Sequence, residues 1–178
     1  MTSADPQATA DFLRTHLGHE MKYLAFAAAE FSRSESSHYQ VALHDSALVR
    51  GRSLIDFFRP GSTNKSMREQ LFCSPGVTQP PRDPLGEKWF TFISGRISHV
   101  GRNRDATFDQ WPDRKPGEYK GDDRLERLAC FVADLMRRRA VYLRSDARAV
   151  LELIAQRAEE YLNNPTEDRF HAMDPAHL

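Results

Sequence analysis

Apolar residues recur at steps of three and four along most of this chain, which is the spacing of one helical face. Asp83-Pro84 is a typical helix start, and Pro60 cannot continue the helix that precedes it. Runs of alternating apolar and polar residues, which would indicate strands, are almost absent. The pattern predicts an all-α, single-domain bundle with five main helices and a tail, at about 6–33, 37–59, 84–101, 123–143, 146–163 and 165–178.

Two long connections, from Pro60 to Arg82 and from Asn103 to Gly121, separate the predicted helices. The second connection and the residue before it mix aromatic and basic side chains, a composition that suits a nucleic-acid single strand. Arg104 and Trp111 are therefore candidate RNA-binding residues. The alternative is that the aromatic rings point inward and anchor the loop to the bundle.

Composition and charge narrow the class of protein. Hydrophobic residues make up 40% of the 178, and the formal net charge is +0, so no general charge field for nucleic acid or a membrane surface is predicted. No stretch approaches the ~20 apolar residues that span a bilayer, and the start of the chain lacks a signal-peptide pattern. We therefore expect a cytoplasmic protein that does not enter a membrane.

Charged residues interrupt two of the apolar helices. In the helix at 37–59, Asp45, Arg52 and Asp56 are spaced to share a face with Leu48 and Ile55. A charge among apolar side chains must be paired, because burying it alone is costly. The spacing predicts that Arg52 is mostly buried and bonded to Asp56 or Asp45.

The helix at 84–101 carries Arg96 and His99, three residues apart, and Arg102 follows it. If this helix packs antiparallel to the one at 37–59, Arg96 and His99 approach Arg52 and Asp56. Such a cluster is a candidate functional site. The alternative is a polar network that only fixes the register of the helices.

Three arginines, Arg137, Arg138 and Arg139, end the helix at 123–143. We expect them to be solvated and to interact favourably with the helix dipole. The alternative is a patch that contacts phosphates.

Two segments carry a family resemblance: His44 to Phe58, which ends in Arg-Ser-Leu-Ile-Asp-Phe-Phe, and Arg96 to Arg104. They resemble uncharacterised bacterial helical proteins related to HEPN domains. The resemblance implies a small helical bundle and, in many members, RNA binding or metal-independent RNA cleavage, often by a homodimer. The nuclease signature of that family is an Arg and a His with four to six residues between them.

The chain departs from that signature, because only two residues separate Arg96 from His99. Arg14 and His19 have the family spacing, as do Arg33 and His38, but the first pair lies on the first helix and the second straddles a helix break. A binding or structural module is therefore our leading interpretation.

Two alternatives remain open. Metal-independent RNA cleavage could use His99 as acid or base, with Arg96 or Arg102 neutralising the phosphorane. A small-molecule or metal site could form in the bundle core from side chains such as His19, Glu20 and His44. No helix carries a His-x-x-x-His or Glu-x-x-His pair, so neither a metal nor a cofactor is predicted.

Overall fold

A computed structural model describes residues 6–59, 69–77, 80–98 and 124–178 of the chain. Within these ranges the protein is all-α, as the apolar spacing predicts, and the only strand-like feature is an isolated bridge between Cys73 and Leu143. The elements are α1 (Pro6–Phe12), η1 (Leu13–Gly18), α2 (His19–Arg33), α3 (Ser37–Phe57), η2 (Glu69–Phe72), α4 (Pro84–Ser98), α5 (Arg124–Ala140), α6 (Ser145–Asn163), α7 (Glu167–His171) and η4 (Pro175–His177).

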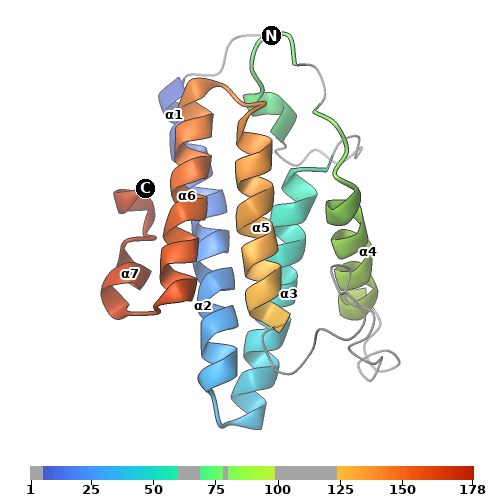
Figure 1. The fold of residues 1–178 in the computed structure, drawn as a ribbon, viewed down its shortest axis with the longest axis vertical. Coiled ribbons are helices and arrows are strands. Elements are labelled where there is room, and N and C mark those ends of the chain that lie inside the picture. The colour runs from blue at the N-terminus through green and yellow to red at the C-terminus, as the bar shows by residue number, and fades with distance from the viewer. Residues whose placement is uncertain (1–5, 60–68, 78–79, 99–123) are drawn as a thin grey trace.

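Four long helices, α2, α3, α5 and α6, stand side by side as the body of the bundle (Figure 1). Helix α4 packs against α3 and runs antiparallel to it, and α7 lies outside α6. None of the helices within the described ranges is long and apolar enough to cross a membrane.

The first predicted helix, at 6–33, is one continuous helical segment with an internal change of geometry. Its middle part, η1, is a π-helix, in which each backbone N–H bonds five residues back rather than four. Leu13 and Leu17, four residues apart, both face the core through this wider turn. Thr15 and His16 consequently lie toward solvent on the other side.

Capping side chains set two helix starts. Asp83 accepts a hydrogen bond from the backbone N–H of Gly86 at 2.7 Å, which confirms the predicted start at Asp83-Pro84. Helix α3 begins at Ser37 as predicted, but its cap is Ser36, whose hydroxyl accepts from the Tyr39 N–H. The tail at 165–178 contains α7 and η4.

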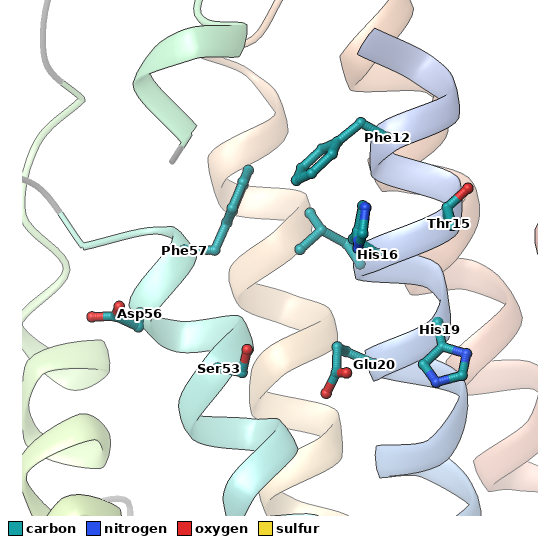
Figure 2. Close-up of a pocket in the computed structure, with 9 residues that line it drawn as sticks. Phe12, Thr15, His16, His19, Glu20, Ser53, Asp56 and Phe57 are labelled. Carbon is teal, nitrogen blue, oxygen red and sulfur yellow. The ribbon is translucent and has the colours of Figure 1, made fainter. Parts of the chain in front are cut away.

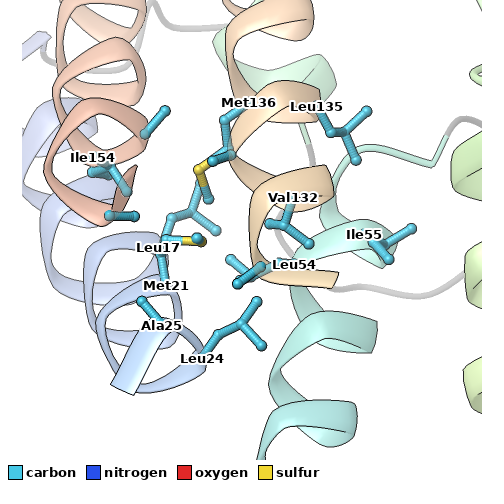
Figure 3. Packing of buried hydrophobic residues seen from close by; sticks show 14 of the residues in the cluster. Leu17, Met21, Leu24, Ala25, Leu54, Ile55, Val132, Leu135, Met136 and Ile154 are labelled. Atoms are coloured by element: carbon cyan, nitrogen blue, oxygen red, sulfur yellow. The ribbon is translucent and has the colours of Figure 1, made fainter. Parts of the chain in front are cut away.

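The core lies between α2, α3, α5 and α6 and is filled by aliphatic side chains (Figure 3). Leu24, Leu54 and Leu128 are 0% exposed. Helix α3 packs tightly on α5 at Gly51, where an added Cβ would lie 2.8 Å from a methyl carbon of Leu128. Gly51 therefore sets the spacing of these two helices.

A buried ion pair attaches η2 to α5. Arg139 and Glu69 are each only 3% exposed in their side chains, and Arg139 Nε donates to Glu69 Oε1 at 2.8 Å. Arg139 also donates to the carbonyls of Pro81 and Phe58. Burial raises the pKa of the Glu69 carboxyl, and the adjacent guanidinium opposes that rise.

The expectation that all three terminal arginines of α5 are solvated is wrong for Arg139, because Arg139 continues the buried stripe of Val132 and Met136. Arg137 and Arg138 are each 43% exposed in their side chains and bound to carboxylates. Arg137 pairs with Glu159 on α6. These internal ion pairs leave little support for a phosphate-contact patch at this end of α5.

The C-terminal segment packs on the outside of η1 and α2. Lys22 is 4% exposed, bonds Asp174, and lies 3.9 Å from the centre of the Phe170 ring. Leu178 is buried against Gly18, where any larger residue would collide with it. The hydrogen bond from Lys22 lowers the pKa of the Asp174 carboxyl.

Candidate functional site

An open cavity of about 400 Å³ lies between α1–η1–α2 on one side and α3 on the other (Figure 2). Three of its lining residues are apolar: Phe12, Leu17 and Phe57. The other six lining residues that the structure describes are polar: Thr15, His16, His19, Glu20, Ser53 and Asp56. The cavity therefore has both an apolar wall and a wall that can form hydrogen bonds.

The apolar wall is held in place by ring contacts. Phe12 and Phe57 are turned toward each other across the cavity (Figure 2). Each also packs on Phe72 of η2, with ring centres 5.7 Å from Phe12 and 5.8 Å from Phe57. The ion pair of Glu69 with Arg139 fixes η2 on α5. Because Phe72 belongs to η2, this buried pair also holds the aromatic wall in place.

The polar wall is made by η1, the start of α2 and one turn of α3. Glu20 points into the space on the side of Ser53, whereas Asp56 is turned toward α4 and His19 away from α3 (Figure 2). His16 stands beside Phe12, with ring centres 4.4 Å apart. The π-helical turn carries Thr15, His16 and Leu17 into the lining, in keeping with the frequent occurrence of π turns at functional sites.

Two ion pairs flank the cavity. Arg50 Nη1 lies 3.2 Å from Glu20 Oε1, and the Arg50 guanidinium lies 5.0 Å from the centre of the Tyr23 ring. Arg59 donates to both Asp56 and Glu87, at 3.2 Å each, and so links α3 to α4. Neither arginine belongs to the cavity lining.

Several polar atoms of the lining have no hydrogen-bond partner among the residues that the structure describes. These are the Ser53 hydroxyl, Glu20 Oε2 and both ring nitrogens of His16. No bond joins Ser53 to His16 or Glu20 within those ranges. The arrangement leaves these donors and acceptors open to the cavity.

The prediction that Arg52 is mostly buried and bonded to Asp56 or Asp45 is wrong. Arg52 is exposed, with its guanidinium 5.2 Å from the centre of the Phe90 ring on α4, and Asp56 accepts from Arg59 instead. The buried face of α3 is centred on Gly51, and the next residue along a helix is rotated by about 100°. Arg52 and Asp56 therefore share a face, but that face lies beside the buried one.

The other predicted site residues fall largely outside the described ranges. His99, Arg102, Arg104 and Trp111 lie outside them, and for Arg96 only the backbone position in α4 is described. The antiparallel packing of α3 and α4, which the proposed approach of Arg96 to Arg52 requires, is present. Catalytic roles for Arg96, His99 and Arg102, and binding roles for Arg104 and Trp111, stay predictions.

Metal ligands do not gather within the described parts of the chain, where no three His, Cys, Asp or Glu side chains could hold one ion. Of the metal candidates named from sequence, His19 and Glu20 line the cavity, while His44 lies beside Asp45. Sequence reasoning missed His16 and Ser53. The available signal for His16 was the run of polar residues opposite Leu13 and Leu17, and no signal marks Ser53.

Comparison with known proteins finds no matching family model, no similar curated protein and no similar solved structure. The resemblance to HEPN-like proteins consequently rests on two sequence segments alone. Membership of that family stays a prediction, as do RNA and a second copy of the chain as partners.

Proposed function

We propose that this chain is a binding module for a small organic molecule, which occupies the cavity between α1–η1–α2 and α3. The observation that carries the proposal is the pairing of two walls around about 400 Å³, one aromatic and one with unengaged hydrogen-bonding atoms. Ligand pockets typically enclose about 300–1,000 Å³ and combine apolar lining with a few polar groups that fix orientation.

The surroundings of the cavity support this role. The aromatic wall packs on Phe72, and Arg50 forms an ion pair with Glu20, so lining groups on both walls are positioned before any ligand arrives. Preformed geometry lowers the ordering cost of binding. The hydroxyl of Ser53, on the opposite side, is open to a ligand because no described residue engages it.

The proposal is tested with three probes that share a phenyl ring and a short chain: phenethylamine, phenethyl alcohol and phenylpropionate. Titration calorimetry on the full chain measures each affinity. Ser53→Phe, which fills the cavity, is compared with Val41→Phe on the same helix. Val41 is 52% exposed, does not line the cavity, and lies about 18 Å along α3 from Ser53.

We expect at least one probe to bind the wild type and Val41→Phe equally. Ser53→Phe should weaken that binding by roughly tenfold or more, about 1.4 kcal/mol, because the new ring takes the ligand's space. Absence of binding by all three probes contradicts the proposal. Equal binding by Ser53→Phe contradicts it as well.

RNA cleavage by His99 with Arg96 or Arg102 is a separate proposal, supported by the resemblance to HEPN-like proteins. Its test is incubation of the purified protein with mixed RNA and EDTA, beside an Arg96→Ala/His99→Ala variant. Cleavage that survives EDTA and is lost in the variant supports the nuclease, and intact RNA contradicts it. Sedimentation of the same sample tests the predicted homodimer.

A further inference from the structure

The charge of the cavity lining suggests a class of ligand. Two carboxylates, Glu20 and Asp56, are among the lining residues, and none of the lining residues that the structure describes is a lysine or an arginine. A concave site with one sign of fixed charge concentrates the opposite charge. We infer that the molecule bound here is an organic cation, with an ammonium or amidinium group at Glu20 and an apolar body between Phe12 and Phe57. This inference rests on the proposed function of the cavity.

Glu20 is the group best placed to receive the cation. Its Oε1 is engaged by Arg50, but no described residue bonds Oε2, and its side chain points toward Ser53 (Figure 2). An ammonium group has three donors and no acceptor. It can donate to Oε2 and to the Ser53 hydroxyl oxygen, and bonds between charged groups are the stronger kind.

Arg50 does not occupy the ligand's place. Its Nε donates to the Ser46 hydroxyl at 3.4 Å, and its guanidinium plane lies near the Tyr23 ring, outside the cavity. These contacts hold the arginine outside the described lining of the cavity. Arg50 therefore orients the carboxylate and leaves its second oxygen to the cavity.

Asp56 adds to the negative potential without touching the ligand. Its carboxylate is turned toward α4, where Arg59 bonds both Asp56 and Glu87. A carboxylate in the cavity lining favours a cation nearby.

The apolar wall suits the rest of such a molecule. Phe12 and Phe57 present their rings on either side of the space, and Leu17 is the third apolar residue of the described lining. Rings bury apolar area, and their faces attract a cation that lies within about 6 Å. His16, next to Phe12, adds a ring nitrogen that can accept a further hydrogen bond.

The three phenyl probes test the inference directly, because they differ only in the polar group. We expect phenethylamine to bind roughly tenfold more tightly than phenethyl alcohol or phenylpropionate at low salt near neutral pH. Glu20→Gln should remove that preference, so that phenethylamine binds no more tightly than phenethyl alcohol. Glu152→Gln is the matched control, since Glu152 is an exposed carboxylate on α6, outside the lining.

The outcomes separate the two proposals. Binding of phenylpropionate as tight as that of phenethylamine, or an undiminished cation preference in Glu20→Gln, overturns the cation and leaves the binding cavity standing. Failure of all three probes to bind overturns both. Loss of the preference in Glu152→Gln as well as Glu20→Gln shows a long-range charge effect and overturns the role of Glu20.

Discussion

Two groups of polar side chains in the described parts of the bundle differ in how their hydrogen bonds are used. At the buried pair of Arg139 and Glu69, each side chain is 3% exposed and the two are bonded to each other. Arg139 also donates to two backbone carbonyls. At the cavity, Ser53 and His16 remain open to solvent, with no partner among the described residues. The first set of groups has a structural role, and the second is free for a ligand.

The difference follows from the cost of burial. A charge removed from water destabilises the fold by several kcal/mol unless it is paired and hydrogen-bonded. A polar group that stays hydrated has no such cost and needs no partner. Polar groups that have no described protein partner at the edge of an aromatic cavity are therefore a better indication of function than a charged residue in an apolar stripe.

The largest expected effect is at the buried pair. Glu69→Gln leaves the Arg139 guanidinium buried without an anion, so we expect unfolding free energy to fall by about 3–5 kcal/mol. Urea unfolding measures the change. The same substitution at Glu160, whose bond to Arg157 joins side chains 38% and 37% exposed, should cost about 0.5 kcal/mol or less. Equal losses for the two variants would contradict the structural role of the buried pair.

An intermediate effect is expected at Lys22. Lys22 is 5% exposed in its side chain but its partner Asp174 is 38% exposed, so loss of the ammonium leaves only a partly hydrated carboxylate behind. Lys22→Met keeps the apolar stem and should cost about 1–2 kcal/mol. Thermal unfolding of this variant should fall between those of Glu69→Gln and Glu160→Gln.

The same pair predicts a pH dependence. The bond from Lys22 lowers the pKa of Asp174 below its ordinary value of 3.8, so the folded state holds this proton less tightly than the unfolded state. The stabilisation is present above that value and is lost as pH falls through the lower folded pKa. Asp174→Asn should therefore be less stable than the wild type near neutral pH, and the gap should close in acid. A gap that stays constant with pH contradicts this.

A smaller effect is expected at Arg52. Exposed stacking of a guanidinium on a ring contributes about 0.5–1 kcal/mol, so Arg52→Ala should lower stability by no more than that. The buried network predicted from the sequence would instead cost on the order of 3 kcal/mol. Urea unfolding distinguishes the two magnitudes.

The sequence predicts the helices well and the polar sites poorly, for one reason. Apolar periodicity reports which residues share a face, and the helix starts at Ser37 and Pro84 follow from it together with capping residues. Apolar periodicity does not report which of two adjacent faces is buried. For this reason Arg52 was predicted to be buried and is exposed, whereas Arg139 was predicted to be solvated and is buried. The stripe of α5 did contain the signal, since three residues after Met136 comes Arg139.

The cavity could not be predicted in this way, because it depends on contacts between distant segments. Ser53 is an exposed residue of α3, and it becomes part of a site only because η1 places His16 opposite. The π-helical geometry of η1 has no distinct pattern in the residues Leu13 to Gly18. The packing of α2 on α3 brings the two sides of the cavity together.

The smallest stability effects are expected at the cavity, and they test the comparison most directly. Ser53→Ala and Thr9→Val each delete one hydroxyl. Thr9 is 3% exposed and accepts a bond from Arg144 at 2.7 Å, so its loss should cost about 1–2 kcal/mol by leaving that donor unpaired. Ser53 is exposed and bonds no described residue, so Ser53→Ala should change unfolding free energy by no more than about 0.5 kcal/mol. Ser53→Ala should nevertheless weaken phenethylamine binding, because an acceptor for the ammonium is lost. A Ser53→Ala variant as unstable as Thr9→Val would place Ser53 with the structural groups and remove the distinction on which the binding proposal rests.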